Sequence, residues 1–114
     1  MVVGIGHMVF RIYPCRSLKE KRRVVKAIVA RIRNHFNASV AEVADNDVYQ
    51  RAVIGVGLVG SDRRLINAKL DKLFNFADGL GIAEMIDAQL EIISLTSTFS
   101  DDGSVGGDFR SNQM

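Results

Sequence analysis

The chain has 114 residues and a net charge of +2, and 47% of its residues are apolar. These values describe one small domain with enough apolar side chains for a core, and no apolar run is long enough to span a bilayer. Cys15 is the only cysteine, which excludes a disulfide framework and a cysteine-based zinc site and suits a reducing cytoplasm. We therefore expect a cytoplasmic protein with no membrane partner.

A first strand is predicted over residues 2–12, where side chains alternate between two faces. The face expected to point toward the core carries Gly4, Gly6, Met8, Phe10 and Ile12. The opposite face carries Val3, Ile5, His7, Val9 and Arg11. Because the second set holds the polar residues, we expect it to face outward.

A helix is predicted within residues 17–36. Ser17 is a good N-cap and Glu20 follows three residues later, a spacing that forms a capping box. The apolar residues form one stripe at helical spacing: Leu18, Val25, Ile28, Val29, Ile32 and Phe36. Lys21 lies toward the same side, and we expect its stem to turn outward to water.

The other side of this helix gathers positive charge. Residues 16–33 hold eight basic residues and one acid, a net charge of +7 against +2 for the whole chain. Five basic residues share about one third of the helix circumference: Lys19, Arg22, Arg23, Lys26 and Arg33. Two interpretations stay open, a solvated surface or contacts with phosphate groups or an acidic partner. The scarcity of acids favours the second a little, because like charges on one face cost stability without a partner.

A hairpin is predicted after the helix. Residues 36–43 form the second strand and residues 51–59 the third, with Ala52, Ile54, Val56 and Leu58 pointing inward. A two-residue turn at Asn46 and Asp47 would pair Glu42 with Arg51 as a cross-strand ion pair on the outer face. The same register would pair Val40 with Val53.

The remaining residues complete a ferredoxin-like plan. Ser61 and Asp62 can cap a second helix over residues 63–80, whose inner stripe is Ile66, Leu70, Leu73 and Ala77 with Phe74 beside it. In a last strand over residues 84–92, the inward set is Ile86, Ala88, Leu90 and Ile92. A polar, flexible tail over residues 94–114 is expected to follow a domain of residues 1–93. The order strand, helix, strand, strand, helix, strand predicts an α+β fold with a four-stranded antiparallel sheet and both helices on one face.

The sheet face without helices is a candidate interface. Its expected apolar centre contains Ile5, Val9, Val53 and Val59, and Val40 and Tyr49 could join them, within a polar rim. Three interpretations remain open: self-association through this face, pairing through an edge strand, or a scatter of solvated valines.

The pattern indicates no reaction. The third strand presents no aromatic ring outward, so base stacking on the sheet, as in RNA-recognition domains of the same plan, is not expected. The loop over residues 13–17 has Arg16 but lacks the glycines of an acyl-phosphate hydrolase, and the third strand has no asparagine. His7 and His35 lie far apart in the pattern, and Cys15 has no clear base beside it. We expect no catalytic residue, no metal and no cofactor.

Three segments resemble the bacterial YlxP-like family, a domain of unknown function. They are SLKEKRRVVK at residues 17–26, FNASVAEV at residues 36–43 and DVYQRAVIGVGLV at residues 47–59, within a match from Met1 to about Ile93. The resemblance implies a small ferredoxin-like domain without catalytic residues. It also suggests a setting in translation, because genes of this family often lie near those for translation initiation and ribosome maturation factors. The tail beyond Ile93 departs from the short ending usual in the family.

Two functions from different classes follow from these observations. The first is a non-enzymatic module that binds structured RNA or the ribosome in translation or ribosome maturation, with its phosphate contacts at Lys19, Arg22, Arg23, Lys26 and Arg33. The second is a dimeric protein-interaction or small-ligand regulatory domain that uses the open sheet face, with its contacts at Ile5, Val9, Val53 and Val59.

Overall fold

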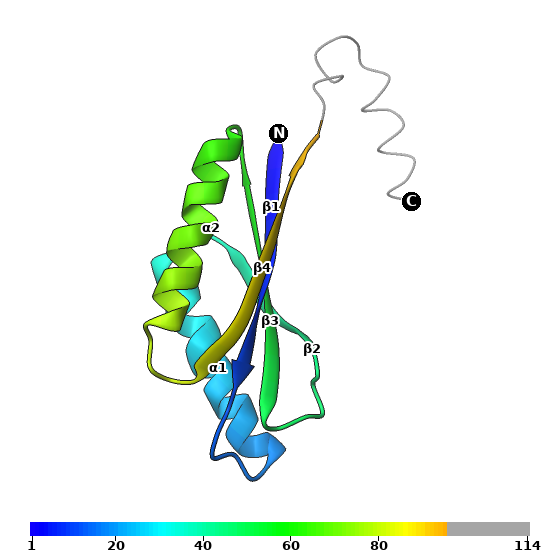
Figure 1. The fold of residues 1–114 in the computed structure, drawn as a ribbon, viewed down its shortest axis with the longest axis vertical. Helices are drawn as coiled ribbons and strands as arrows, with labels where there is room; N and C mark the ends of the chain where they lie inside the picture. Colours follow the sequence, from blue (N-terminus) through cyan, green and yellow to red (C-terminus); the bar gives the residue numbers. More distant parts are fainter. Residues whose placement is uncertain (96–114) are drawn as a thin grey trace.

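The computed structural model describes residues 1–95 and confirms the predicted architecture. The elements in chain order are β1 (Val2–Arg11), α1 (Leu18–His35), β2 (Ser39–Ala44), β3 (Arg51–Gly60), α2 (Arg63–Asp78) and β4 (Glu84–Ser94). The strands form one antiparallel sheet in the order β2-β3-β1-β4, so β2 and β4 are its edges. Both helices cover the same face of this sheet (Figure 1).

The two helices lie at different heights along the strands and meet near the middle of the sheet (Figure 1). Their C-terminal ends come together, where the ring of His35 on α1 stacks on Phe76 of α2 at 4.2 Å between centroids. Phe36 meets the same Phe76 edge-on at 5.5 Å. These rings join the two helices at their ends, so each helix covers its own half of the sheet.

Small residues on β1 let α2 approach the sheet closely. A Cβ atom at Gly4 would collide with Ile66 and Leu70, and one at Gly6 would lie 2.7 Å from the ring of Phe74. The predicted inner stripe of α2 is confirmed by this packing, since Ile66 and Leu70 are almost fully buried. The glycines of β1 therefore set the distance between the helix layer and the sheet.

The predicted register of the hairpin is wrong. Glu42 pairs with Ile54, and Val40 pairs with Val56. The turn does lie where it was predicted, because the N–H of Val48 donates to the carbonyl of Asp45 at 3.0 Å. The chain then needs residues 48–50 before β3 begins, because no glycine is present to close a two-residue turn.

This change of register includes a bulge at Val43, between the pairs Glu42–Ile54 and Ala44–Val53, and it moves two side chains. Val40 is buried in the core under the helices, so it does not belong to the open face. Arg51 forms its ion pair with Asp45, at 2.8 Å, and not with Glu42. Glu42 points toward the helix layer, where its carboxylate lies 2.8 Å from the ammonium of Lys21.

The prediction that Lys21 turns outward to water is wrong. Its side chain is 1% exposed, and its ammonium also donates to the backbone carbonyl of Asp45. A buried lysine needs such partners, because an unpaired charge in an apolar interior is strongly unfavourable. The pair between Lys21 and Glu42 therefore fixes the first turn of α1 against the end of β2.

The predicted inward position of Ile86 on β4 is wrong. A bulge on β4 places Met85 opposite Phe10 and Asp87 opposite Val9, which leaves Ile86 between them. Ile86 is therefore 43% exposed, and Met85 takes the inward position against the core. The predicted tail over residues 94–114 lies outside the described residues, except for Ser94, which ends β4, and Leu95.

Candidate nucleic-acid interface and open sheet face

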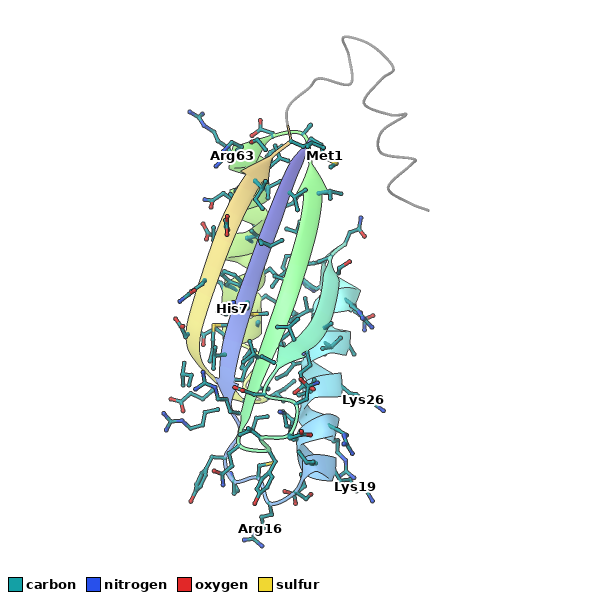
Figure 2. All side chains as sticks on the ribbon, turned by 90° about the vertical axis from the view of Figure 1, so that its right-hand side faces the viewer. Met1, His7, Arg16, Lys19, Lys26 and Arg63 are labelled. Atoms are coloured by element: carbon teal, nitrogen blue, oxygen red, sulfur yellow. The ribbon has the colours of Figure 1, made fainter. Side chains whose placement is uncertain are left out.

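The first candidate site is the basic stripe of α1, formed by Lys19, Arg22, Arg23 and Lys26. Arg22 and Arg23 are adjacent, and each lies three or four residues from Lys19 and from Lys26, so the four share one side of the helix, and all four are exposed. Figure 2 shows Lys19 and Lys26 projecting from α1 away from the sheet. The capping box orients the start of the helix, since the N–H of Glu20 donates to Ser17 Oγ and the Glu20 carboxylate accepts from the N–H of Arg16.

No carboxylate neutralises this stripe within the described part of the chain. The ion pairs found among residues 1–95 join Arg11 to Glu84, Lys21 to Glu42 and Arg51 to Asp45. Over seven residues a helix rises about 10 Å, which is close to the Debye length at 0.1 M salt, so the four charges of the stripe repel one another in solution. An anionic partner would relieve that repulsion.

Arg33 differs from the other predicted phosphate contacts. Its guanidinium donates at 2.7 Å to the carbonyl of Val40, which holds the side chain against β2 at the edge of the sheet. A second arginine does the same at the opposite edge, where Arg63 of α2 donates to the carbonyl of Ile92 at 3.4 Å and to Ser94 Oγ at 2.9 Å on β4. Each edge strand thus has one carbonyl occupied by an arginine from a helix.

The second candidate site is a groove of about 710 Å³ on the open face of the sheet. Figure 2 views this face, with His7 on it and the helices behind. The groove runs over two glycines of β3, Gly55 and Gly57. Val43 fills the space above Gly55, but in the described part of the chain no atom lies within 4 Å of the position that a Cβ of Gly57 would take. Other side chains around the groove include Ile5, Ser39, Ala41, Gln89, Glu91 and Arg33.

The predicted interface residues divide into two pairs. Ile5 and Val59 are open to solvent, with exposed fractions of 41% and 70%. Val9 and Val53 lie opposite each other on neighbouring strands and are already buried, at 5% and 9%. Whatever contacts the open face meets Ile5 and Val59 more readily than the other two.

The other candidate residues form no cluster. His7 lies opposite Gly55 on one side and Gln89 on the other. Cys15 is buried, and its thiol donates to the carbonyl of Ser17 at 3.5 Å. Within residues 1–95, no group of three or more histidine, cysteine, aspartate and glutamate side chains is placed to hold a metal ion. In the same range, no helix is long and apolar enough to cross a membrane.

Sequence reasoning missed the hollow above Gly57 and the anchoring of Arg33. A strand glycine gives a signal only when the register shows what lies over it, and the predicted register of the hairpin was wrong. Arg33 fits the periodicity of the basic stripe, and only the position of β2 shows that its guanidinium has a backbone partner.

Comparison with known proteins matches residues 3–90 to the family model described as protein of unknown function, DUF503. A curated relative, the uncharacterized protein YlxP of Bacillus subtilis strain 168, is 36% identical over 77 residues, which are 68% of this chain and 84% of that protein.

Two solved structures are similar at lower levels. The de novo designed protein Foldit4 has a TM-score of 0.49 and 12% identity, over 84% of this chain and all (100%) of that one. A REP-associated tyrosine transposase bound to a REP hairpin has a TM-score of 0.39 and 12% identity, over 87% of this chain and 60% of that one. Likenesses this low support no inference about function.

Proposed function

The chain belongs to the DUF503 family of proteins of unknown function, and because that family brings no activity with it, we propose a function from the geometry of the described residues. The protein is a non-enzymatic cytoplasmic module that binds structured RNA or the ribosome, in translation or ribosome maturation. The basic stripe of α1 makes the contacts, through the phosphate groups of the RNA backbone.

One observation carries this proposal, namely that four exposed cations share one side of a helix with no ion pair to a described residue. Surface cations that serve only solubility are commonly interspersed with acids. Phosphate contacts position a protein on nucleic acid without reading its sequence, so a stripe of lysine and arginine with no aromatic platform suits recognition of a folded RNA backbone.

The test is co-sedimentation of the full chain with ribosomal subunits over a range of salt concentrations. Four phosphate contacts predict a slope of about −3 to −4 in a plot of log affinity against log salt, because each contact on a duplex contributes about −0.9 and on a single strand about −0.7. Arg22→Glu combined with Arg23→Glu should weaken binding by at least about tenfold.

The matched control reverses two charges on the other helix. Lys69 and Lys72 of α2 are also exposed and form no ion pair with a described residue, so Lys69→Glu combined with Lys72→Glu changes the net charge equally and should leave most of the affinity intact. An affinity that does not depend on salt concentration, or that falls equally in both double variants, would show that the basic stripe is not the contact surface.

A further inference from the structure

Gly57 is a glycine for which residues 1–95 give no packing or backbone reason. It does not have the left-handed backbone that favours glycine, which among the described glycines occurs at Gly81. A Cβ at Gly57 would meet no atom of the described residues within 4 Å, whereas one at Gly4 or Gly60 would press on Ile66. Glycine inside a strand weakens the strand, and it often marks a place where a ligand or another backbone approaches closely. A contact with something beyond the described residues therefore explains Gly57 best.

The neighbours of Gly57 across the sheet form a row on the open face. The pairing of the strands places Ile5 of β1 beside Gly57, Ser39 of β2 on its other side, and Glu91 of β4 beyond Ile5. In this row a projecting apolar side chain, Ile5, stands next to a hollow, Gly57. A projection and a hollow side by side are what a self-complementary surface needs, because a two-fold axis between them exchanges one with the other.

We propose that the open face binds a second copy of this chain around a two-fold axis that runs parallel to the strands, between β1 and β3. Such an axis exchanges β1 with β3 and keeps each row of residues level. Ile5 of one copy then enters the hollow over Gly57 of the other, and the reverse contact forms at the same time. The two sheets pack face to face, as in a β-sandwich, with the helices on the outside.

The charges at the two edges of the sheet favour this axis over a two-fold axis that runs across the strands. The same rotation exchanges β2 with β4, so Glu91 of β4 faces the partner's β2 at the level of Ser39, where Arg33 lies at the groove beside Val40. A two-fold axis running across the strands would instead place β4 over β4, with like charges opposed, and opposed like charges in an interface are costly.

Two further observations favour a second copy over other occupants. The groove is wide and open, whereas a site for a small molecule usually encloses most of its ligand. Pairing through an edge strand is hindered at both edges, because Arg33 and Arg63 already occupy a carbonyl of β2 and of β4. The open face is the remaining surface on which two sheets of this chain can meet.

The test is sedimentation equilibrium of the full chain with three variants. In Gly57→Ile, two isoleucines oppose each other at both symmetric contacts, and the dissociation constant should rise by at least about thirtyfold. The variant should still fold, because the added side chain has free space and isoleucine favours strands. Ile5→Gly should also weaken the dimer, since it removes the projecting side chain.

The third variant exchanges the two residues. Ile5→Gly combined with Gly57→Ile puts the projection on β3 and the hollow on β1, and the two-fold axis should restore the dissociation constant to within about tenfold of the wild type. A monomer of altered stability could not produce this recovery, because the exchange restores complementarity only between two copies. Urea unfolding of each variant separates loss of folding from loss of the dimer.

A control variant changes an exposed apolar residue away from the sheet. Leu65 on α2 is 60% exposed, close to the value for Val59, so Leu65→Lys should leave the dissociation constant unchanged. A wild-type chain that stays monomeric up to about 100 µM would overturn the proposal, since even a micromolar dimer would then be nearly complete. A dimer that Gly57→Ile leaves intact, or that the exchange does not restore, would overturn it as well.

Discussion

Lys21 shows how one charged residue can hold an element in place. Its ammonium lies 2.8 Å from the carboxylate of Glu42 and has 1% exposure, so both charges depend on each other. We expect Lys21→Met to lower the free energy of unfolding by about 3 kcal/mol, because Glu42 then keeps a largely buried charge without a partner. Lys21→Met combined with Glu42→Leu should recover most of this loss, as measured by urea unfolding.

Lys19 provides the control for this prediction. It lies in the same turn of α1 but is exposed, so Lys19→Met should change stability by no more than about 0.5 kcal/mol. If Lys21→Met alone were as stable as the wild type, the ion pair would not be what holds α1 to β2. The helical wheel placed Lys21 on the apolar side, but it could not show that Glu42 faces it, because that depends on the register of β2.

At the scale of elements, α1 carries two surfaces with opposite requirements. Its apolar stripe packs on the sheet and follows from periodicity alone. Its basic stripe places Lys19 four residues before Arg23 and Arg22 four before Lys26, and such like-charge pairs destabilise a helix by a few tenths of a kcal/mol each. These pairs therefore make the helix less stable than a helix of the same length without them. A role of the charges in binding would explain why they are present.

This conflict predicts a variant in which stability and binding change in opposite directions. Lys19→Glu replaces the repulsion with Arg23 by an attraction and adds an acid to the first turn, so we expect a gain of about 0.5 to 1 kcal/mol in urea unfolding at low salt. The same variant should bind ribosomal subunits more weakly. Equal affinity of the variant and the wild type would argue that Lys19 lies outside the contact surface.

The strands show where prediction from sequence stops. The faces of β1 and the inner residues of β3 follow from simple alternation, and the structure confirms them. The bulges at Val43 and Ile86 cannot be predicted from this alternation. Each bulge adds one residue to a strand and reverses the alternation beyond it. The alternation of side chains along a strand does not show where a bulge interrupts it, so the sequence assigned Glu42 and Ile86 to the wrong faces.

The whole molecule combines a basic stripe on the helix layer with a hollowed face on the opposite side of the sheet. In the proposed dimer the helix layers lie outside, so the two basic stripes point away from each other and one duplex contacts a single stripe. The salt slope should therefore stay at about −3 to −4 for both the wild type and monomeric Gly57→Ile. Filter binding to a short RNA duplex, at protein concentrations above and below the dimer dissociation constant, measures this slope.

A slope that doubles on dimerisation would mean that both stripes reach the same RNA, which the proposed two-fold axis does not allow.

The order of elements and the shared face of the helices could be predicted from the sequence, because they depend on periodicity and on chain connectivity. The groove could not, since it arises from Gly57 in one strand, Val43 in a bulge and Ile5 in a third strand, whose relative positions only the register fixes.

The arginines at the two sheet edges have a consequence for the behaviour of this protein at high concentration. Unoccupied carbonyl and N–H groups along an edge act as a template on which further chains add as strands, and such growth leads to fibrils. Arg33 and Arg63 each place a charged, hydrated group at that template. Replacement of either by alanine would therefore first reduce the yield of unaggregated protein, before melting temperature or RNA affinity changed much.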